Sequence, residues 1–472
     1  MTSPTRSGSR PHTAPAWLVL SLVCACQFMV ILDASIVNVA LPSIRADLGF
    51  TPTGLAWVVN GYLLTFAGFM LLGGRAADLF GPRRTLVVGL VVFSASSLVC
   101  GVCSAAEVLV AARIVQGVGA AVLGPSTLAV INTGFAEPHA RARAFGAWSA
   151  SGGVGGMAGA LAGGALTTGL SWRWVFLVNV PIGVVLVVVA ALALRGARGG
   201  GREPLDHLGA VTGTAGLAVL IYGVMGSVDH GWTSPLVVGS VVVGSLLLVA
   251  FVAVEARFAG RPMMPLRLFR IRSVAVGNAM LLLFGAVAIA MWYFTSLLLQ
   301  NVFGWSALEA GLGQTPAAVA FVVVARVAAA LLPRTGVRNL VVAGCGSLVA
   351  GFGWLAQADV GTGYAAGVLG PTLLIAVGIG LTFPTLVAAA TAGVPEGDAG
   401  ITGGVASAAS QAGGSVGLAV LATVAGGGAE AATVAAGYDR VFLVAAGLGV
   451  AIAALCLVVP RAQAGEPRSV AG

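Results

Sequence analysis

The amino-acid sequence predicts a polytopic α-helical membrane protein, and its composition carries most of this prediction. Of its 472 residues, 58% are hydrophobic and only 8% are charged. A soluble domain has about 25% charged residues, so this chain lacks the polar surface that a soluble protein exposes to water. Its apolar residues also form runs of about 20, the length with which a helix crosses the hydrocarbon core of a bilayer.

Charged residues, prolines and Gly-rich polar clusters divide the apolar sequence into fourteen candidate spans. In chain order, the predicted spans cover residues 17–40, 53–73, 85–103, 107–131, 143–168, 174–194, 208–227, 235–255, 274–299, 308–332, 338–357, 363–390, 400–425 and 438–460. At about 22 residues each, they leave only short connections. The sequence therefore has no room for a soluble catalytic domain.

The predicted spans form two groups of six with an extra pair between them. Spans 4 and 12 share a Gly-rich stretch that ends in a proline, and spans 5 and 13 are both dense in glycine. Parallel repeats of this kind are typical of transporters. The predicted division is an N-terminal tail over 1–16, a bundle over 17–195, a central pair over 196–256, a second bundle over 257–461 and a C-terminal tail over 462–472.

The arginines predict how the chain is oriented in the membrane. All 24 basic residues are arginine, because the sequence contains no lysine. With both termini in the cytoplasm, nineteen arginines lie on the cytoplasmic side and three, Arg45, Arg173 and Arg440, on the outer side. This asymmetry satisfies the positive-inside rule. The net charge of +8 is thus explained by topology and by lipid contact, and it does not indicate nucleic-acid binding.

Several classes of protein are excluded by residues that the sequence lacks or does not group. Without lysine, neither a Walker P-loop nor a lysine Schiff base can form. The six cysteines lie in apolar runs, and no set of four metal ligands clusters, so we expect neither a disulfide framework nor a metal site. A membrane-embedded enzyme would need a group of His, Cys, Asp or Glu residues within the spans, and the sequence has none. We therefore expect no cofactor and no enzymatic activity.

Two charged residues inside predicted spans are the strongest functional signal. Asp33 lies in span 1, where an ionised carboxylate costs about 2.5–3.5 kcal/mol on insertion scales, and Arg113 lies in span 4. Each is about seven residues from the outer face, or roughly 10 Å deep, so they can meet if spans 1 and 4 are neighbours. The pair is then either a site of proton chemistry or a structural ion pair that locks two helices.

The second half of the chain has no equivalent of this pair. In span 12, Leu374 takes the position that corresponds to Arg113. Val377 likewise takes the position of Gln116, and spans 9 to 14 contain no central acid. Any proton chemistry is therefore expected in the first half.

A substrate cavity is predicted beside the charged pair. Arg113, Gln116, Gly117, Ala120 and Gly124 share one stripe of span 4, where small residues continue the face that carries the charge. The two tryptophans at positions 57 and 148 are candidates for stacking against a substrate, whereas the others suit the membrane interface. The candidate cavity residues are Met29, Trp57, Asn60, Gln116 and Trp148.

The predicted cytoplasmic connection between spans 2 and 3 combines glycines, an aspartate and paired arginines. An Asp at a helix end beside arginines can hold a gate closed through charge-assisted hydrogen bonds, and the glycines permit a tight turn and a close helix approach. The same charges also suit a purely topogenic role. The candidate gate residues are Gly74, Asp78, Gly81, Arg83 and Arg84.

Span 5 contains a regular glycine pattern made by Gly155, Gly159, Gly163 and Gly164. Gly159 and Gly163 are four residues apart, so they stack on one side of the helix. Glycines in this arrangement let the backbone of a neighbouring helix approach closely.

Two of these segments resemble motifs of the major facilitator superfamily. Residues 74–84 resemble its loop motif, G-x-L-A-D-R-x-G-R-R, although Leu79 stands where the motif has Arg and Ala76 where it has Leu. Residues 113–121 match the proton-coupling motif of the fourteen-span drug:proton antiporters in that superfamily.

Three further segments extend the resemblance to the fourteen-span antiporters. Residues 32–42 resemble their first-span motif, and residues 172–183 are similar to a further hallmark of the group. Residues 155–164 resemble the antiporter motif g-x-x-x-G-P-x-x-G-G, with Ala160 in place of its Pro. Five motifs in the expected order identify the chain as a member of this family.

The resemblance implies a major facilitator fold with two six-helix bundles and two extra central helices, in which spans 1, 4, 9 and 12 line a cavity. It implies that Asp33 is the protonation site and Arg113 its coupling partner. The implied function is export of amphipathic drugs or antibiotics by alternating-access antiport, with protons as the coupling ion. The implied setting is the bacterial cytoplasmic membrane, where a monomer contacts lipid. Uptake or facilitated diffusion of a small metabolite by the same fold is the alternative.

The arginine asymmetry predicts that both termini lie in the cytoplasm. Cysteines introduced singly by Ser7→Cys and Ser469→Cys should therefore resist a membrane-impermeant thiol reagent in intact cells. Labelling of either cysteine from outside would overturn the predicted topology.

Overall fold

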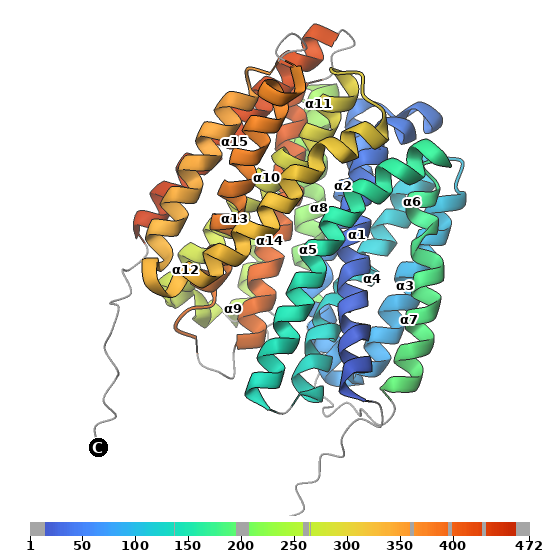
Figure 1. Cartoon of the computed structure of the whole chain (residues 1–472), viewed down its shortest axis with the longest axis vertical. Coiled ribbons are helices and arrows are strands. Elements are labelled where there is room, and N and C mark those ends of the chain that lie inside the picture. Colours follow the sequence, from blue (N-terminus) through green and yellow to red (C-terminus); the bar gives the residue numbers. More distant parts are fainter. Residues whose placement is uncertain are drawn as a thin grey trace, which may run out of the picture. The chain divides into compact units, whose positions relative to one another are not determined.

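A computed structural model describes residues 15–135, 137–194, 207–257, 264, 266–358, 363–394, 399–426 and 431–458. Within these ranges every regular element is helical, and ten helices are long and apolar enough to cross a membrane (Figure 1). The prediction of an all-α polytopic membrane protein is therefore confirmed. The predicted tails lie almost entirely outside the described residues.

The helices follow the predicted spans closely. In chain order they are α1 (Ala16–Leu48), α2 (Pro52–Phe80), α3 (Pro82–Val102), α4 (Ala106–Gly134), α5 (Pro138–Gly169), α6 (Trp174–Leu177), α7 (Asn179–Ala193), α8 (His207–His230), α9 (Pro235–Arg257), the 3₁₀ turn η1 (Leu266–Arg270), α10 (Arg272–Ile289), the π-helix η2 (Ala290–Phe294), α11 (Thr295–Asn301), α12 (Ala307–Leu355), the π-helix η4 (Ala365–Leu369), α13 (Gly370–Ala390), α14 (Ala399–Ala425) and α15 (Ala431–Val458). Each predicted span falls on one or more of these helices. The count of fourteen crossings stays a prediction.

Two predicted spans lie in the segment α12, which is interrupted by a kink. At Gly336 the backbone leaves the helical region, with φ 74° and ψ 164°, so α12 consists of two helices joined at a kink. A positive φ is readily adopted only by glycine. Pro333, just before the kink, lacks the N–H that would continue the helical hydrogen bonding. The two halves correspond to predicted spans 10 and 11.

Helix α1 extends eight residues beyond its predicted end. It stops at Leu48 because Gly49 adopts the left-handed conformation with φ 68°, and its N–H bonds back to the Arg45 carbonyl. Arg45, which we expected in an outer connection, therefore lies in the last turn of α1. The expectation was wrong because it ended the helix where the apolar run ends, whereas backbone geometry continues it through charged residues.

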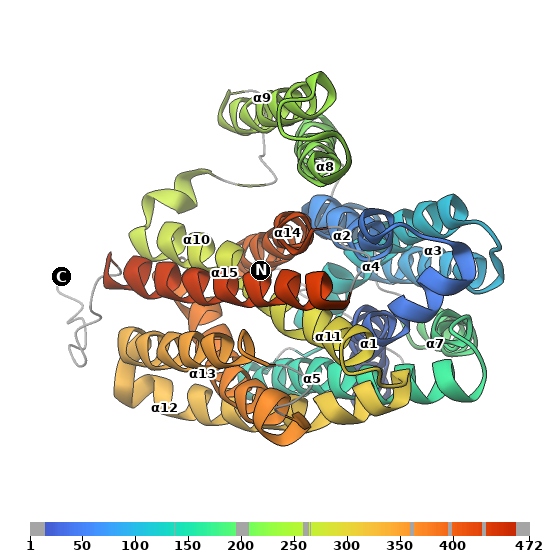
Figure 2. The ribbon, with the colours of Figure 1, turned by 90° about the horizontal axis from the view of Figure 1, so that it is seen from above.

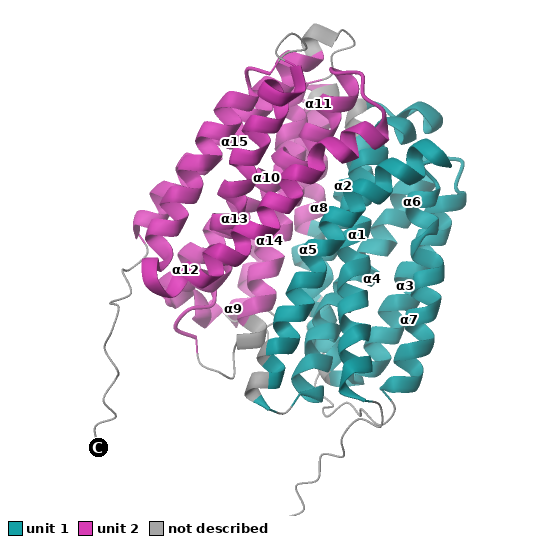
Figure 3. Ribbon diagram, in the orientation of Figure 1, with its two compact units in different colours: residues 1–215 teal, residues 216–472 magenta. Residues whose placement is uncertain are grey.

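The chain divides into two compact units, Met1–Ala215 and Gly216–Gly472 (Figure 3). In unit 1, α1 packs against α5, and α4 packs against both α2 and α3 (Figure 2). Gly117 brings α4 close to α2, since a Cβ there would collide with the Tyr62 carbonyl oxygen. Gly119 does the same towards α3, where a Cβ would lie 2.8 Å from the Phe93 nitrogen. Small residues thus set the spacing around α4.

The glycines of α5 form the predicted close contact with a neighbouring backbone, and that neighbour is α1. A Cβ on Gly159 would lie 2.8 Å from the Leu32 carbonyl oxygen, and one on Gly163 would lie 2.6 Å from the Ile36 carbonyl oxygen. A Cβ on Gly155, one turn earlier, would lie 2.7 Å from the Phe28 carbonyl oxygen. The glycines and the carbonyls they face both repeat every four residues, so the two helices pack along a shared stripe. Gly164 is also buried.

Unit 2 uses the same packing between α10 and α14. A Cβ on Gly417 would lie 2.5 Å from the Ala286 Cα, and Gly413 lies against the Leu282 backbone. Spans 9 and 13 therefore pack as spans 1 and 5 do, which agrees with the internal repeat expected from the sequence.

The predicted register between spans 4 and 12 needs correction. Gly378 faces Leu348 in the second half of α12, whereas Gly380 faces Val324 in the first half. The second half of α12 is span 11, which corresponds to span 3 in the internal repeat. In unit 1, the glycine that faces span 3 (α3) is Gly119. A shift of two residues matches these neighbours and also pairs the two prolines of the spans.

In the corrected register, Thr372 corresponds to Arg113 and Ile375 to Gln116, in place of Leu374 and Val377. The Thr372 hydroxyl donates to the Val368 carbonyl of the preceding helical turn, at 2.7 Å. The counterpart of the arginine is therefore still uncharged. Shared glycines misled the alignment, because these two helices use them against different neighbours.

The α1–α5 stripe can be tested at Gly159. The Gly159→Ala methyl would lie 2.6 Å from the Ser35 Cβ, so the helices must separate. We expect the variant to lose about 1–3 kcal/mol of stability, seen as a lower melting temperature in detergent. Gly156→Ala is the matched control, because its methyl would have Ile31 Cγ2 as nearest neighbour at 3.7 Å. Equal melting of the two variants would show that the packing at Gly159 is not tight.

Candidate functional site

Asp33 and Arg113 form a buried ion pair in unit 1. The Arg113 Nη1 donates to Asp33 Oδ2 at 2.7 Å, and the two side chains are 0% and 1% exposed for Asp33 and Arg113 respectively. The contact exists because α1 and α4 are neighbours, as its prediction required. Both charges are removed from water, so each depends on the other and on nearby dipoles.

Two amide side chains complete the surroundings of the carboxylate. Gln116 Nε2 donates to Asp33 Oδ1 at 2.9 Å, and Asn179 Nδ2 donates to the same oxygen at 2.7 Å. Both amides also reach the hydroxyl oxygen of Ser97, at 2.6 Å from Gln116 and 3.3 Å from Asn179. Asp33 therefore accepts three hydrogen bonds, from α4 and α7, in a site closed by α3.

The guanidinium of Arg113 is held equally firmly. Its Nε donates to the Val58 carbonyl of α2 at 3.0 Å, and its Nη1 also donates to Gln116 Oε1 at 2.8 Å. Its planar face lies 4.3 Å from the centre of the Tyr62 ring, with the Phe176 ring at 5.7 Å. Cation–π contact and charge-assisted hydrogen bonds both offset the loss of hydration.

Local sequence explains how these groups converge. Arg113 and Gln116 are three residues apart and therefore lie on one face of α4. Asn179 is the first residue of α7, where the helix breaks after α6. Pro181 contributes to that break, since it has no N–H to bond the carbonyl four residues earlier.

Sequence reasoning missed Asn179 and Ser97 as members of this site. Asn179 lies within residues 172–183, a segment whose only predicted significance was as a family motif. Both are polar residues inside apolar runs, and both are fully buried. That polarity was the available signal, but the sequence could not show that α3 and α7 bring them to the carboxylate.

The five predicted cavity residues divide into two groups. Met29, Asn60 and Gln116 are each 0% exposed, so none of them faces open space in this structure. Trp57 and Trp148 are half-buried. The Trp148 indole N–H donates to Thr127 Oγ1 of α4 at 3.0 Å. The structure brings Gln116 to the ion pair, and a substrate role for any of the five stays a prediction.

The predicted gate loop is a tight turn between α2 and α3. Gly81 has φ 87°, a conformation that favours glycine, and Pro82 begins α3 directly after it. The close helix approach occurs at Gly73, where a Cβ would collide with the Ala121 carbonyl oxygen of α4. We had expected Gly74 to provide it, but a Cβ on Gly74 would have Pro125 Cβ as its nearest neighbour at 3.6 Å, an ordinary van der Waals contact.

The charged residues of this loop have different surroundings. Arg83 Nη2 donates to the Ala191 carbonyl in the last turn of α7 at 2.8 Å. A positive side chain at a helix C-terminus both satisfies a free carbonyl and complements the helix dipole. Arg84 is exposed, and the side chain of Asp78 lies outside the described residues. The gate role of these residues stays a prediction.

A second ion pair lies at the C-terminal end of α1. Asp47 Oδ2 accepts from Arg173 Nη1 at 2.7 Å and from the Trp172 indole at 2.9 Å. The Arg173 guanidinium also lies 4.4 Å from the Trp172 ring and donates to the Cys103 carbonyl at 3.2 Å. These contacts tie the end of α1 to α6 and to the end of α3.

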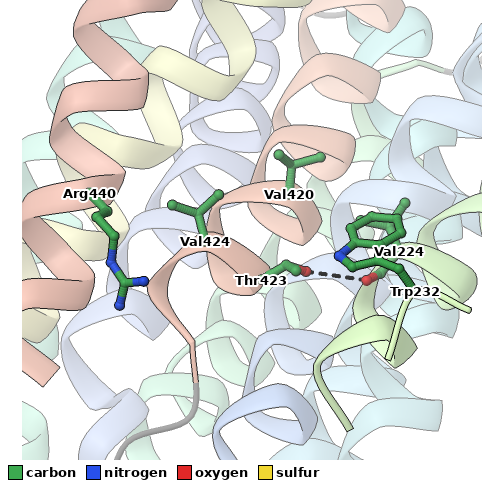
Figure 4. Close-up of a pocket in the computed structure, with 6 residues that line it drawn as sticks. All are labelled: Val224, Trp232, Val420, Thr423, Val424 and Arg440. Atoms are coloured by element: carbon green, nitrogen blue, oxygen red, sulfur yellow. Dashed lines mark hydrogen bonds between the residues drawn. The ribbon is translucent and has the colours of Figure 1, made fainter. Parts of the chain in front are cut away.

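Unit 2 contains a cavity of about 370 Å³ that the sequence did not predict (Figure 4). The Thr423 hydroxyl, at its centre, donates to the Val224 carbonyl at 3.2 Å and so links α14 to α8. Its lining residues are Val224, Trp232, Val420, Thr423, Val424 and Arg440. It shares no residue with the predicted substrate cavity.

Comparison with known proteins identifies the family. The Major Facilitator Superfamily profile matches residues 23–418 of the chain. The chain belongs to the major facilitator superfamily. Over 471 residues it is 43% identical to the cephamycin export protein CmcT of Amycolatopsis lactamdurans, covering 99% of this chain and 97% of that relative.

Two further comparisons agree with this assignment. The chain is 38% identical over 416 residues to the puromycin resistance protein pur8 of Streptomyces alboniger, covering 86% of this chain and 81% of the relative. Its fold matches the crystal structure of a D-xylose-proton symporter with a TM-score of 0.69, covering 95% of this chain and 99% of that one at 13% identity. The predicted family is confirmed, and the protein is a multi-pass membrane transporter rather than an enzyme.

The mutual dependence of the buried charges predicts non-additive mutations. Arg113→Met leaves the Asp33 carboxylate buried without its partner, which should cost about 3–5 kcal/mol of stability. Asp33→Leu strands the guanidinium in the same way. The double variant buries no charge, so its loss should be smaller than the sum of the two single losses. Thermal unfolding of the purified variants measures all three, and additive losses would contradict the coupling.

Proposed function

We propose that this transporter exports antibiotics or other amphipathic drugs in exchange for protons. The buried Asp33–Arg113 pair is the observation that carries the proposal, because it places a titratable group inside the membrane-spanning part of unit 1. The names of the two relatives above, an antibiotic export protein and an antibiotic resistance protein, support the substrate class. The coupling ion is the proton, and no cofactor takes part.

The charge balance of the pair explains how protons drive the cycle. With Asp33 ionised, its negative charge and the positive charge of Arg113 cancel, and the buried site is neutral. Protonation of Asp33 leaves the guanidinium as an uncompensated buried charge, which strongly disfavours the same packing. The two protonation states therefore favour different conformations, as alternating access requires.

The available energy is sufficient for export. One proton that moves through a membrane potential of about 150 mV releases roughly 3.5 kcal/mol. That free energy supports a concentration ratio of a few hundredfold for the exported compound.

The same proposal places the protein in the bacterial cytoplasmic membrane as a monomer with both termini in the cytoplasm. The arginine asymmetry supports this orientation. Exposed valines and leucines along α9 suit contact with lipid acyl chains. The turn at Gly81 then lies on the cytoplasmic side, where a gate between α2 and α3 would act.

The half-buried tryptophans support an amphipathic substrate. Trp57 and Trp148 offer flat apolar rings from α2 and α5, and such rings bind drug-like molecules without demanding one polar pattern. Expression of this transporter in cells of a sensitive host should therefore lower the accumulation of puromycin. Increased accumulation would instead support uptake, the alternative function.

Proton release by the purified protein tests the role of Asp33. Puromycin added in weak buffer should release protons from the wild type, and Asp33→Asn should abolish this release because the amide does not titrate. Asp33→Glu should retain part of it, and Arg113→Ala should impair it by removing the partner charge. Asp47→Asn is the matched control, since Asp47 is a 45% exposed carboxylate on the same helix. Normal release by Asp33→Asn would show that the proton site lies elsewhere.

A further inference from the structure

Asn179 has one atom whose state the ion pair does not explain. Its Nδ2 donates to Asp33 and Ser97, but its Oδ1 is buried without a hydrogen-bond partner. An unpaired buried carbonyl oxygen is costly, so its presence beside the ion pair calls for an explanation. The question is what could donate to this oxygen at another stage of the transport cycle.

The ionised carboxylate accounts for the present orientation of the amide. Asp33 Oδ1 is an acceptor, so at 2.7 Å it must face the NH₂ end of Asn179. The reversed amide would place two oxygens against each other. Protonation of Asp33 changes this requirement, because the new O–H is a donor that needs an acceptor in the same buried space.

Two other acceptors at this site, both bonded to the guanidinium, are already engaged. Gln116 Oε1 accepts from Arg113, and the Val58 carbonyl accepts from the same guanidinium. Gln116 cannot reverse without breaking its bond to Arg113. Asn179 is therefore the amide at this site that can turn over without disturbing the guanidinium.

We propose that Asn179 is the positioning residue that registers the protonation of Asp33 by reversing its side-chain amide. A half-turn about the terminal torsion, which has a roughly two-fold preference in asparagine, exchanges Oδ1 and Nδ2. Oδ1 then accepts from the Asp33 O–H and from the Ser97 hydroxyl, which changes from acceptor to donor. In either orientation one end of the amide is paired and the other is not, so the reversal itself leaves no additional end of the amide unpaired. The inference rests on the proposed function, since it requires Asp33 to titrate.

The groups that can influence this titration are few. Among the residues that the structure describes, the charged or titratable side chains that interact with Asp33 are Arg113 from α4, Tyr62 from α2 and Cys100 from α3. The described membrane portion of α5, residues 144–169, and helices α6 and α7 contain no titratable residue. On the α7 side, the group that can respond to the protonation of Asp33 is therefore the neutral amide of Asn179.

The position of Asn179 gives the reversal a structural consequence. Asn179 is the first residue of α7, and the other end of that helix accepts the hydrogen bond of Arg83 at the Ala191 carbonyl. Asn179 and Ala191 are twelve positions apart, or about 18 Å along the helix. A change in the bonds of Asn179 to α1 and α3 therefore acts on a helix whose far end is tied to the turn at Gly81.

Infrared difference spectroscopy between alkaline and acidic pH tests the reversal directly. The sample is the full-length protein with ¹³C-labelled asparagine, and the Asn179 band is identified by its absence in Asn179→Ser and Asn179→Leu. A reversed amide accepts at Oδ1, so its carbonyl stretch moves to lower wavenumber as the Asp33 carboxyl band appears. A merely structural Asn179 only loses its donor bond, which moves the stretch to higher wavenumber. A shift upward, or no shift, overturns the inference.

Asp33→Asn separates this inference from the proposed function. The carboxyl band and the Asn179 shift should both disappear in that variant. If the carboxyl band persists, Asp33 is not the titrating group, and the proposed function and the inference both fail. If only the downward Asn179 shift is missing from the wild type, the proposed function stands and the inference fails.

Transport in proteoliposomes provides the functional test. Puromycin transport driven by a pH gradient should fall about tenfold in Asn179→Leu, which can neither donate nor accept. Asn179→Ser should recover most of the rate, because a hydroxyl does both. Asn278→Leu is the matched control, since Asn278 is a buried asparagine of α10 that also has an unpaired Oδ1 but bonds only the Val274 carbonyl through its Nδ2. A wild-type rate in Asn179→Leu, or an equal loss in Asn278→Leu, would contradict the assigned role.

Discussion

The buried pairing of Arg113 with Asp33 is the interaction on which the structure of unit 1 depends. Neither charge has access to water, so the cost of burying both must be offset within the protein. The offset comes from α1, α2, α3, α4 and α7, each of which contributes a side chain or a carbonyl to the site. A shift of any of these helices by one turn would leave an unpaired charge or a broken hydrogen bond, so the pair selects one arrangement of the bundle.

Glycine contacts make that arrangement possible. In lipid, helices gain little from apolar contact alone, and association depends on close packing of small residues. Gly117 and Gly119 bring α4 close to α2 and α3, and the stripe around Gly159 brings α5 close to α1. The charged site therefore sits between helices whose separation is set by missing side chains. Unit 2 repeats the packing between α10 and α14 without the charges, which shows that the two features are separable.

The proposed coupling chemistry is thus concentrated in one half of a repeated fold. In the proposed cycle the pair gives unit 1 two states of different charge, to which we expect the amides of Gln116 and Asn179 to respond differently. Gln116 is committed to both members of the pair, whereas Asn179 has an unused acceptor. Through α7, the same site is linked to Arg83 and to the turn that begins α3.

The sequence alone was enough to predict the class of protein, the position of nearly every helix and the two charged site residues, Asp33 and Arg113. It could do so because hydrophobic run length and a charge inside a run are local properties, read from neighbouring residues alone. It failed at the end of α1, where Gly49 and not the loss of hydrophobicity stops the helix. Helix packing was needed to show which residues meet the carboxylate, which glycines are in contact and how the two halves correspond. Asn179 is 146 positions from Asp33, and no local pattern records a contact that depends on the packing of α7 against α1 and α3.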